Sequence, residues 1–226
     1  MSVVAEGFRL RVCHRKSGRL RFLSHLEVVR ACERAARRAG LPYAVSQGFT
    51  PRMRMSFGPA LPVGTAGERE YYDLTLTRYL PAAEACASLT AVTAEDLAPL
   101  HCGYVTAREP SLAAALTIAM YELSLEGGIP PEELQGSLLG LMGAGTISVE
   151  HKGKQKVYDL TEALPKEPEV ASDGGRTLVR LAVRMGEHGS LRPEVLIRSA
   201  LGRSVRAVVT RTDLLIDDEG VWRRPL

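Results

Sequence analysis

RFLSHLEVVRACERAARRAGLPYAVSQGFTPRMRMSFG, residues 21–58, is the stretch of sequence that decides the fold of the first half of the chain. Residues 24–39 are predicted to form a helix, which is closed by Gly40 and by Pro42 just beyond it. At about 100° per residue, one side of this helix is apolar, and the pattern predicts that this side faces a sheet. The residues on that side are Val28, Val29, Cys32, Ala35, Ala36 and Ala39.

Extended segments are predicted on both sides of the helix. FRLRVCH (8–14) alternates apolar and polar residues, and RLRFLS (19–24) resumes the alternation after a turn-prone Lys-Ser-Gly. The two segments form either a hairpin or one long bulged strand. YAVSQ (43–47) and RMRMSF (52–57) are also expected to be extended, with breaks at Gly48 and at Pro51.

The order of the remaining segments predicts the fold class. In the first half, a strand at 71–77, a helix at 81–90 and a strand near 100–106 complete the order β-α-β-β-α-β. The second half repeats this order, with residues 151–176 expected to be mostly connection. Its other segments are strands at 115–125, 146–150, 177–185 and 205–216, and helices at 130–143 and 192–201. The prediction is an α+β protein of two tandem ferredoxin-like units with antiparallel sheets, at 1–110 and 111–226.

Composition excludes several classes of protein. The 226 residues are 45% hydrophobic and 24% charged, as in ordinary globular domains, and contain no apolar run long enough to cross a membrane. The first residues do not resemble a signal peptide, so a cytoplasmic protein is expected. The four cysteines have no close spacing, so we expect reduced thiols and neither a zinc nor an iron–sulfur site in this chain.

The charge of the chain is unevenly distributed. The net charge is only +3, yet residues 7–57 have twelve basic residues and only Glu27 and Glu33 oppose them. Such a concentration indicates an anionic partner. The basic residues are Arg9, Arg11, Arg15, Lys16, Arg19, Arg21, Arg30, Arg34, Arg37, Arg38, Arg52 and Arg54.

The start of the predicted helix allows two interpretations. Ser24 and Glu27 fit a capping box, in which each side chain bonds to the backbone of the other, and this motif explains both residues without a substrate. His25 falls on the sheet-facing side of the first turn. It is either a half-buried structural histidine or a catalytic residue whose neutral imidazole accepts a proton.

Several residues of this segment are candidate contacts for nucleic acid. The helix arginines form a stripe away from the sheet, and Arg52 and Arg54 are expected on a helix-free sheet face beside Arg9 and Arg11. Phosphate contact is better supported than base recognition, because Phe49 is the only plausible stacking ring. The candidates are Lys16, Arg30, Arg34, Arg37, Arg38, Phe49, Arg52 and Arg54.

The run from Lys16 and Gly18 through residues 21–64, followed by Glu70 and Tyr71, resembles a family of bacterial radical-SAM-associated proteins. Members of that family are fused behind, or encoded beside, a radical-SAM protein with a cobalamin-binding domain. The chain departs from the family pattern by Glu27 for Asp, Thr50 for Asn and Arg52 for His. The resemblance implies a partner of a radical-SAM enzyme in RNA modification or translation-linked metabolism. It also implies that S-adenosylmethionine, the iron–sulfur cluster and cobalamin are bound by the partner.

Three functions remain open from the sequence. The first is an accessory protein that binds RNA or another polyanion for a radical-SAM enzyme. The second is a metal-independent endoribonuclease that uses His25 with Lys16 or Arg52. The third is a protein-interaction module whose arginines contact an acidic surface of its partner.

Overall fold

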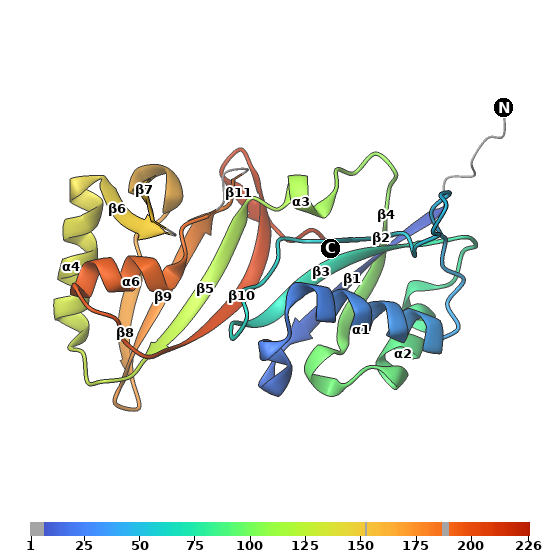
Figure 1. The fold of residues 1–226 in the computed structure, drawn as a ribbon, viewed down its shortest axis with the longest axis horizontal. Helices are drawn as coiled ribbons and strands as arrows, with labels where there is room; N and C mark the ends of the chain where they lie inside the picture. The colour runs from blue at the N-terminus through green and yellow to red at the C-terminus, as the bar shows by residue number, and fades with distance from the viewer. Residues whose placement is uncertain (1–6, 152, 187–189) are drawn as a thin grey trace. The chain divides into compact units, whose positions relative to one another are not determined.

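The computed structural model describes residues 7–151, 153–186 and 190–226. The chain divides into two compact units, of which one ends at Leu116 and also includes Arg224–Leu226, and the other is Thr117–Arg223. The division lies at 116/117 rather than at the predicted 110/111, and the last three residues belong to the first unit. Each unit combines helices with an antiparallel sheet (Figure 1).

The first unit follows the element order that the sequence predicts, and its helices α1 and α2 cover one face of its sheet (Figure 1). The sheet has the order β4-β1-β3, with β2 paired to β3, and every pairing is antiparallel. The elements are β1 (Phe8–Lys16), a 3-10 helix η1 (Gly18–Phe22), α1 (His25–Arg38), β2 (Met55–Phe57), β3 (Ala66–Leu76), α2 (Ala82–Val92), η2 (Glu95–Leu97), β4 (Pro99–Val105) and α3 (Leu112–Ala115).

The core of the first unit forms where the inward side of β1 meets α1. Leu10 and Val12 are fully buried, because alternate residues of a strand face the same side of a sheet. They belong to one apolar cluster with Cys32 and Ala36 of α1. The helix side predicted to face the sheet therefore does so, and α1 is held by its apolar side while its polar side is exposed to solvent.

The segment RLRFLS is not a strand, which corrects the sequence prediction. The chain turns at Gly18, whose φ is 49°, and residues Gly18–Phe22 form η1. Ser17 fixes the turn, because its backbone amide donates to the carbonyl of Asp96 and its hydroxyl donates to the carboxylate of Asp96. Alternation of apolar residues could not reveal these bonds, which come from a segment almost 80 positions away.

The segment 43–57 is also less regular than predicted. Only Met55–Phe57 forms a strand, and YAVSQ contributes two isolated bridges, Tyr43 with Leu76 and Val45 with Met53. The intervening residues form a loop that leaves the sheet and returns to it.

The second unit has the sheet order β10-β5-β9-β8, again antiparallel, with β11 paired to β10. Residues 151–176, predicted as mostly connection, contain parts of a β6–β7 hairpin, a short helix and β8, so that prediction was wrong. Glycines with positive φ make the turns between these short strands, at Gly153 and at Gly174 and Gly175. The elements are β5 (Ile118–Leu125), α4 (Pro131–Ala144), β6 (Thr146–His151), β7 (Lys154–Asp159), α5 (Leu160–Ala163), β8 (Glu169–Asp173), β9 (Arg176–Arg184), α6 (Pro193–Leu201), β10 (Ala207–Asp218) and β11 (Val221–Arg223).

Among the described residues, every helix is too short or too polar to cross a bilayer. Cys13, Cys32 and Cys102 are buried and Cys86 is half-buried, and each carries a thiol rather than a disulfide. Burial raises the pKa of the Cys32 thiol to about 12, so it packs as a small apolar side chain at neutral pH.

Candidate functional site

Helix α1 begins with the capping box formed by Ser24 and Glu27. The Ser24 hydroxyl accepts from the backbone amide of Glu27 at 3.4 Å, and the Glu27 carboxylate accepts from the Ser24 backbone amide at 2.8 Å. The Ser24 hydroxyl, followed by its backbone amide, lowers the pKa of Glu27 by donating to the carboxylate. This stabilisation is therefore present above the usual pKa of glutamate and is lost as the pH falls through the lowered value. The box fixes where α1 starts and hence where His25 lies.

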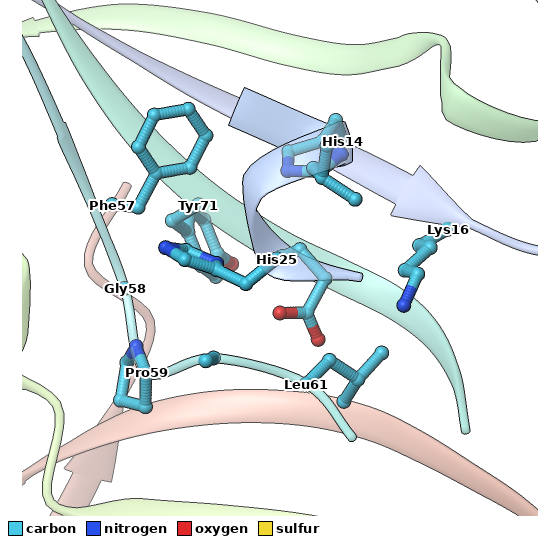
Figure 2. Close-up of a pocket in the computed structure, with 11 residues that line it drawn as sticks. His14, Lys16, His25, Phe57, Gly58, Pro59, Leu61 and Tyr71 are labelled. Atoms are coloured by element: carbon cyan, nitrogen blue, oxygen red, sulfur yellow. The ribbon is translucent and has the colours of Figure 1, made fainter. Parts of the chain in front are cut away.

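His25 lines a small pocket in the first unit. Figure 2 shows the rings of His25 and Phe57, the backbone turn at Pro59 and the ammonium of Lys16 around this space. The pocket has a volume of about 30 Å³, which is room for one or two water molecules. Its lining residues are His14, Lys16, His25, Val28, Phe57, Gly58, Pro59, Ala60, Leu61, Glu70 and Tyr71.

Three buried ionisable side chains lie behind His25. His14 of β1 pairs with Glu70 of β3 in the sheet register, and both are buried. Lys16 is only 2% exposed, and its ammonium donates to the backbone carbonyl of Leu23 at 2.8 Å. Because charged groups are costly to bury, three such residues around one pocket indicate a specialised site.

Lys16 is therefore placed in the pocket and not on the exposed surface where a phosphate contact was predicted. Lys16 shares the pocket with His25, which is half-buried.

Aromatic contacts hold the His25 ring in place. The ring meets Phe57 edge to face, with the centroids 5.7 Å apart, and Phe57 stacks on Tyr72 at 5.3 Å. Tyr72 in turn contacts the His14 ring at 5.5 Å. This row of rings connects His25 to His14 and restricts the orientation of both imidazoles.

The pocket could support proton transfer, since two imidazoles, a carboxylate and an ammonium surround it. It is too small for a nucleotide, so a large substrate could present only a small group at His25. Within the described part of the chain, no group of three or more His, Cys, Asp or Glu side chains is arranged to hold a metal ion.

The arginines of α1 lie on its solvent side. Arg30, Arg34, Arg37 and Arg38 are all exposed, and Glu33 approaches Arg37 at 3.7 Å as a partly exposed i,i+4 pair. Such a pair contributes little in water, so most of the positive charge on this side of α1 remains available.

A second set of exposed basic residues lies on the loop 45–54. Its base is closed by the bridge of Val45 with Met53 and by the amide of Ser46, which donates to the carbonyl of Arg52 at 2.8 Å. Arg52 and Arg54 are exposed on the part of the loop that returns to the sheet. Gly48, Phe49 and Pro51 form the exposed tip, and the Phe49 side chain is fully exposed.

We refer to these residues as the arginine surface. It consists of Arg30, Arg34, Arg37 and Arg38 of α1, with Arg52, Arg54 and Phe49 of the loop. The two elements follow each other directly, because α1 ends at Arg38 and only 39–44 separate it from the loop. From Arg54 the chain continues through β2 to Phe57, so the loop also leads into the pocket of His25.

The predicted basic, helix-free face of the first sheet does not exist. Arg11 is 1% exposed and its guanidinium donates to Asp73 twice, at 2.7 and 2.9 Å, and to the carbonyl of Pro225 at 3.1 Å. Arg9 donates to the carbonyls of Thr106 and Glu109. These arginines were assigned to an open face by alternation alone, and the C-terminal residues that cover Arg11 are more than 200 positions away.

Sequence reasoning missed His14 and Glu70 as members of the site. A signal for His14 exists in the sequence, because it continues the inward series Leu10, Val12 at the next alternate position. A polar residue at an inward position requires a partner, which makes such residues candidates for a site. Glu70 was noted only as part of the family pattern, and its place beside His14 follows from the strand register.

The comparison with protein families gives a clear result. Residues 9–193 match the model of a family described as an uncharacterized protein conserved in bacteria, DUF2344. The chain belongs to this family. The matched range includes the whole pocket and the arginine surface, so both lie within the part that defines DUF2344.

No curated protein matches the sequence. Among solved structures, matches include an H/ACA ribonucleoprotein bound to a substrate RNA containing 2′-deoxyuridine, and the archaeal box H/ACA Nop10–Cbf5 complex. Each is 13% identical with a TM-score of 0.43, and they cover 94% and 93% of this chain. The chain spans about half the length of the chains it matches, 50% in both cases.

Proposed function

We propose that this DUF2344 protein binds single-stranded RNA through the arginine surface and serves as an accessory protein of a radical-SAM enzyme. The observation that carries the proposal is the exposure of six arginines on two consecutive elements, with Glu33 as their one ion-paired carboxylate among the described residues. Like charges at helical spacing destabilise a helix, so such a cluster has a cost that phosphate groups would remove.

The loop supports RNA as the polyanion. Phe49 at its tip is fully exposed, beside Arg52 and Arg54. An exposed ring among arginines suits a strand with unpaired bases, because the ring can stack on a base while the guanidinium groups contact phosphates. A smooth duplex would leave that ring without a partner.

The association with a radical-SAM enzyme rests on the resemblance of residues 15–73 to radical-SAM-associated proteins. In this proposal the iron–sulfur cluster, S-adenosylmethionine and cobalamin belong to the partner, and this chain brings RNA to it in RNA modification or translation-linked metabolism. The proposed location is the cytoplasm, where both RNA and reduced thiols occur.

We further interpret both units as ferredoxin-like. In the first unit the strand order β4-β1-β3-β2 supports this interpretation, and β10-β5-β9-β8 supports it in the second if the β6–β7 hairpin is an insertion.

The double replacement Arg52→Ala and Arg54→Ala is expected to weaken binding of a single-stranded RNA by roughly 10-fold at ~0.1 M salt. Two phosphate contacts are lost, so the slope of log K against log salt should fall in magnitude by about 1.4. The measurement is fluorescence anisotropy with a labelled oligonucleotide over a range of salt. Arg203→Ala with Arg206→Ala removes two exposed arginines from the second unit and is the matched control. If the salt slope of the Arg52/Arg54 variant equals that of the wild type, these arginines do not contact phosphates, and a contact with a partner protein is the alternative.

A second candidate function, metal-independent RNA cleavage, is favoured by one observation. His25 shares its pocket with His14, Lys16 and Glu70, and general acid–base cleavage of RNA needs groups of this kind beside the ribose. The volume of the pocket favours the accessory role, because it admits no more than a small group.

His25→Ala separates the two functions. For an accessory protein, the variant should bind RNA with nearly the affinity of the wild type, because His25 lies outside the arginine surface. For a nuclease, it should bind equally but lose cleavage of a labelled single-stranded RNA in the presence of a chelator. If the wild type cleaves the RNA and the His25→Ala variant does not, the protein is a nuclease and the accessory role is wrong.

A further inference from the structure

Three aromatic rings from distant parts of the chain meet at one end of the first unit. Phe8 starts β1, Tyr79 follows β3 and Tyr104 lies in β4. The ring of Phe8 meets Tyr79 and Tyr104 edge to face, at 5.8 and 6.3 Å, and the two tyrosine rings are 5.2 Å apart. We refer to Phe8, Tyr79 and Tyr104 as the aromatic cluster.

The aromatic cluster is rigid at its base and open to solvent. The Tyr104 hydroxyl donates to the carbonyl of Leu80 at 2.6 Å and accepts from its amide at 3.3 Å, which fixes that ring. Phe8 remains 43% exposed and Tyr79 59% exposed. Water-exposed rings held in a fixed arrangement are typical of a binding surface, because ordering them before binding reduces the entropic cost of the contact.

The aromatic cluster adjoins the arginine surface. Phe8 pairs with Leu76 at the end of β3. The next residue, Thr77, contacts the segment that follows α1, because the Thr77 amide donates to the carbonyl of Pro42 at 2.7 Å. The start of β1, the end of α1 and the base of the loop 45–54 therefore lie at the same end of the unit, as Figure 1 shows. Arg78, between Thr77 and Tyr79, is exposed as well.

We propose that unpaired bases of the bound RNA stack on the aromatic cluster while its phosphates contact the arginine surface. This inference rests on the proposed function and extends it, since it makes base stacking a second source of affinity beside charge. Stacking is tolerant of sequence because every base has a π-face, so binding without strong sequence preference is expected. Exposed Arg78 beside the cluster, and the base of the loop that carries Arg52 and Arg54 at the same end of the unit, favour a phosphate-bearing occupant over an uncharged apolar one.

The test compares two probes of equal charge, a single-stranded oligouridylate and an abasic ribose-phosphate oligomer of the same length. Tyr79→Leu should weaken binding of the oligouridylate by about 5- to 20-fold, in line with the loss of one stacked base. Binding of the abasic oligomer and the salt slope of both should stay unchanged, because no charge is removed. Tyr79→Phe keeps the ring and should retain the wild-type affinity. Tyr158→Leu, on the β6–β7 hairpin, is the control for loss of a tyrosine elsewhere.

Each outcome has a distinct meaning. If the wild type binds the oligouridylate with an affinity that falls as salt rises, but Tyr79→Leu does not change that affinity, the proposed stacking site is wrong and the proposed function stands. Equal losses of affinity for the two probes in the Tyr79→Leu variant would also contradict the stacking proposal, since the abasic oligomer has no base that could stack. If the wild type binds neither probe at low salt, the proposed function itself fails.

Discussion

Replacing Asp73 by alanine is expected to destabilise the first unit by roughly 3–5 kcal/mol, the typical result of removing one partner of a buried ion pair. Asp73 accepts two hydrogen bonds from Arg11, and both side chains are almost fully buried. Arginine stays protonated in proteins, so the variant would leave a buried cation with only the carbonyl of Pro225 as a described partner. Urea unfolding of the purified variant measures the loss.

The matched control is Glu122→Ala in the second unit. Glu122 forms an ion pair with Arg180 at 2.9 Å, but both side chains are exposed to water, so we expect a loss of about 0–1 kcal/mol. Replacing Arg11 by Met together with Asp73 by Leu should recover much of the stability, because neither charge of this pair then remains buried. Equal effects of the Asp73 and Glu122 variants would show that the buried pair is not an important support of the first unit.

Removing all six arginines of the arginine surface should have the largest effect on RNA binding. Alanine at positions 30, 34, 37, 38, 52 and 54 should lower affinity by roughly 100-fold or more at ~0.1 M salt, since each phosphate contact on a single strand contributes about 0.7 to the salt slope. These side chains are exposed, so the fold should remain intact, and circular dichroism checks this. Retained affinity would mean that RNA binds elsewhere on the chain.

The sequence predicted the parts of the fold that depend on local patterns. The apolar periodicity of α1, its capping box and the glycine after it are all encoded within 20 residues, and the helix His25–Arg38 starts and ends within one residue of the prediction. Exposure of the α1 arginines follows from the same periodicity.

The errors arose where distant residues decide the structure. Asp96 turns RLRFLS into a 3-10 helix, and Pro225 covers Arg11, and neither contact leaves a trace in the local pattern. The aromatic cluster was not predicted for the same reason, because Phe8, Tyr79 and Tyr104 come together only through the order of the strands β4, β1 and β3 in the sheet. The pocket was seen only in part, since His25 was a candidate while His14 and Glu70 were not.

The salt dependence of RNA binding by the unmodified protein tests the central claim most directly. Anisotropy of a labelled single-stranded RNA should show tight binding at low salt that weakens steeply, with a slope of about 4 in log K against log salt if six phosphates are contacted. A protein that binds no RNA at ~20 mM salt, or binds it without a salt slope, would contradict the account. The arginine surface would then be a site for an acidic protein partner.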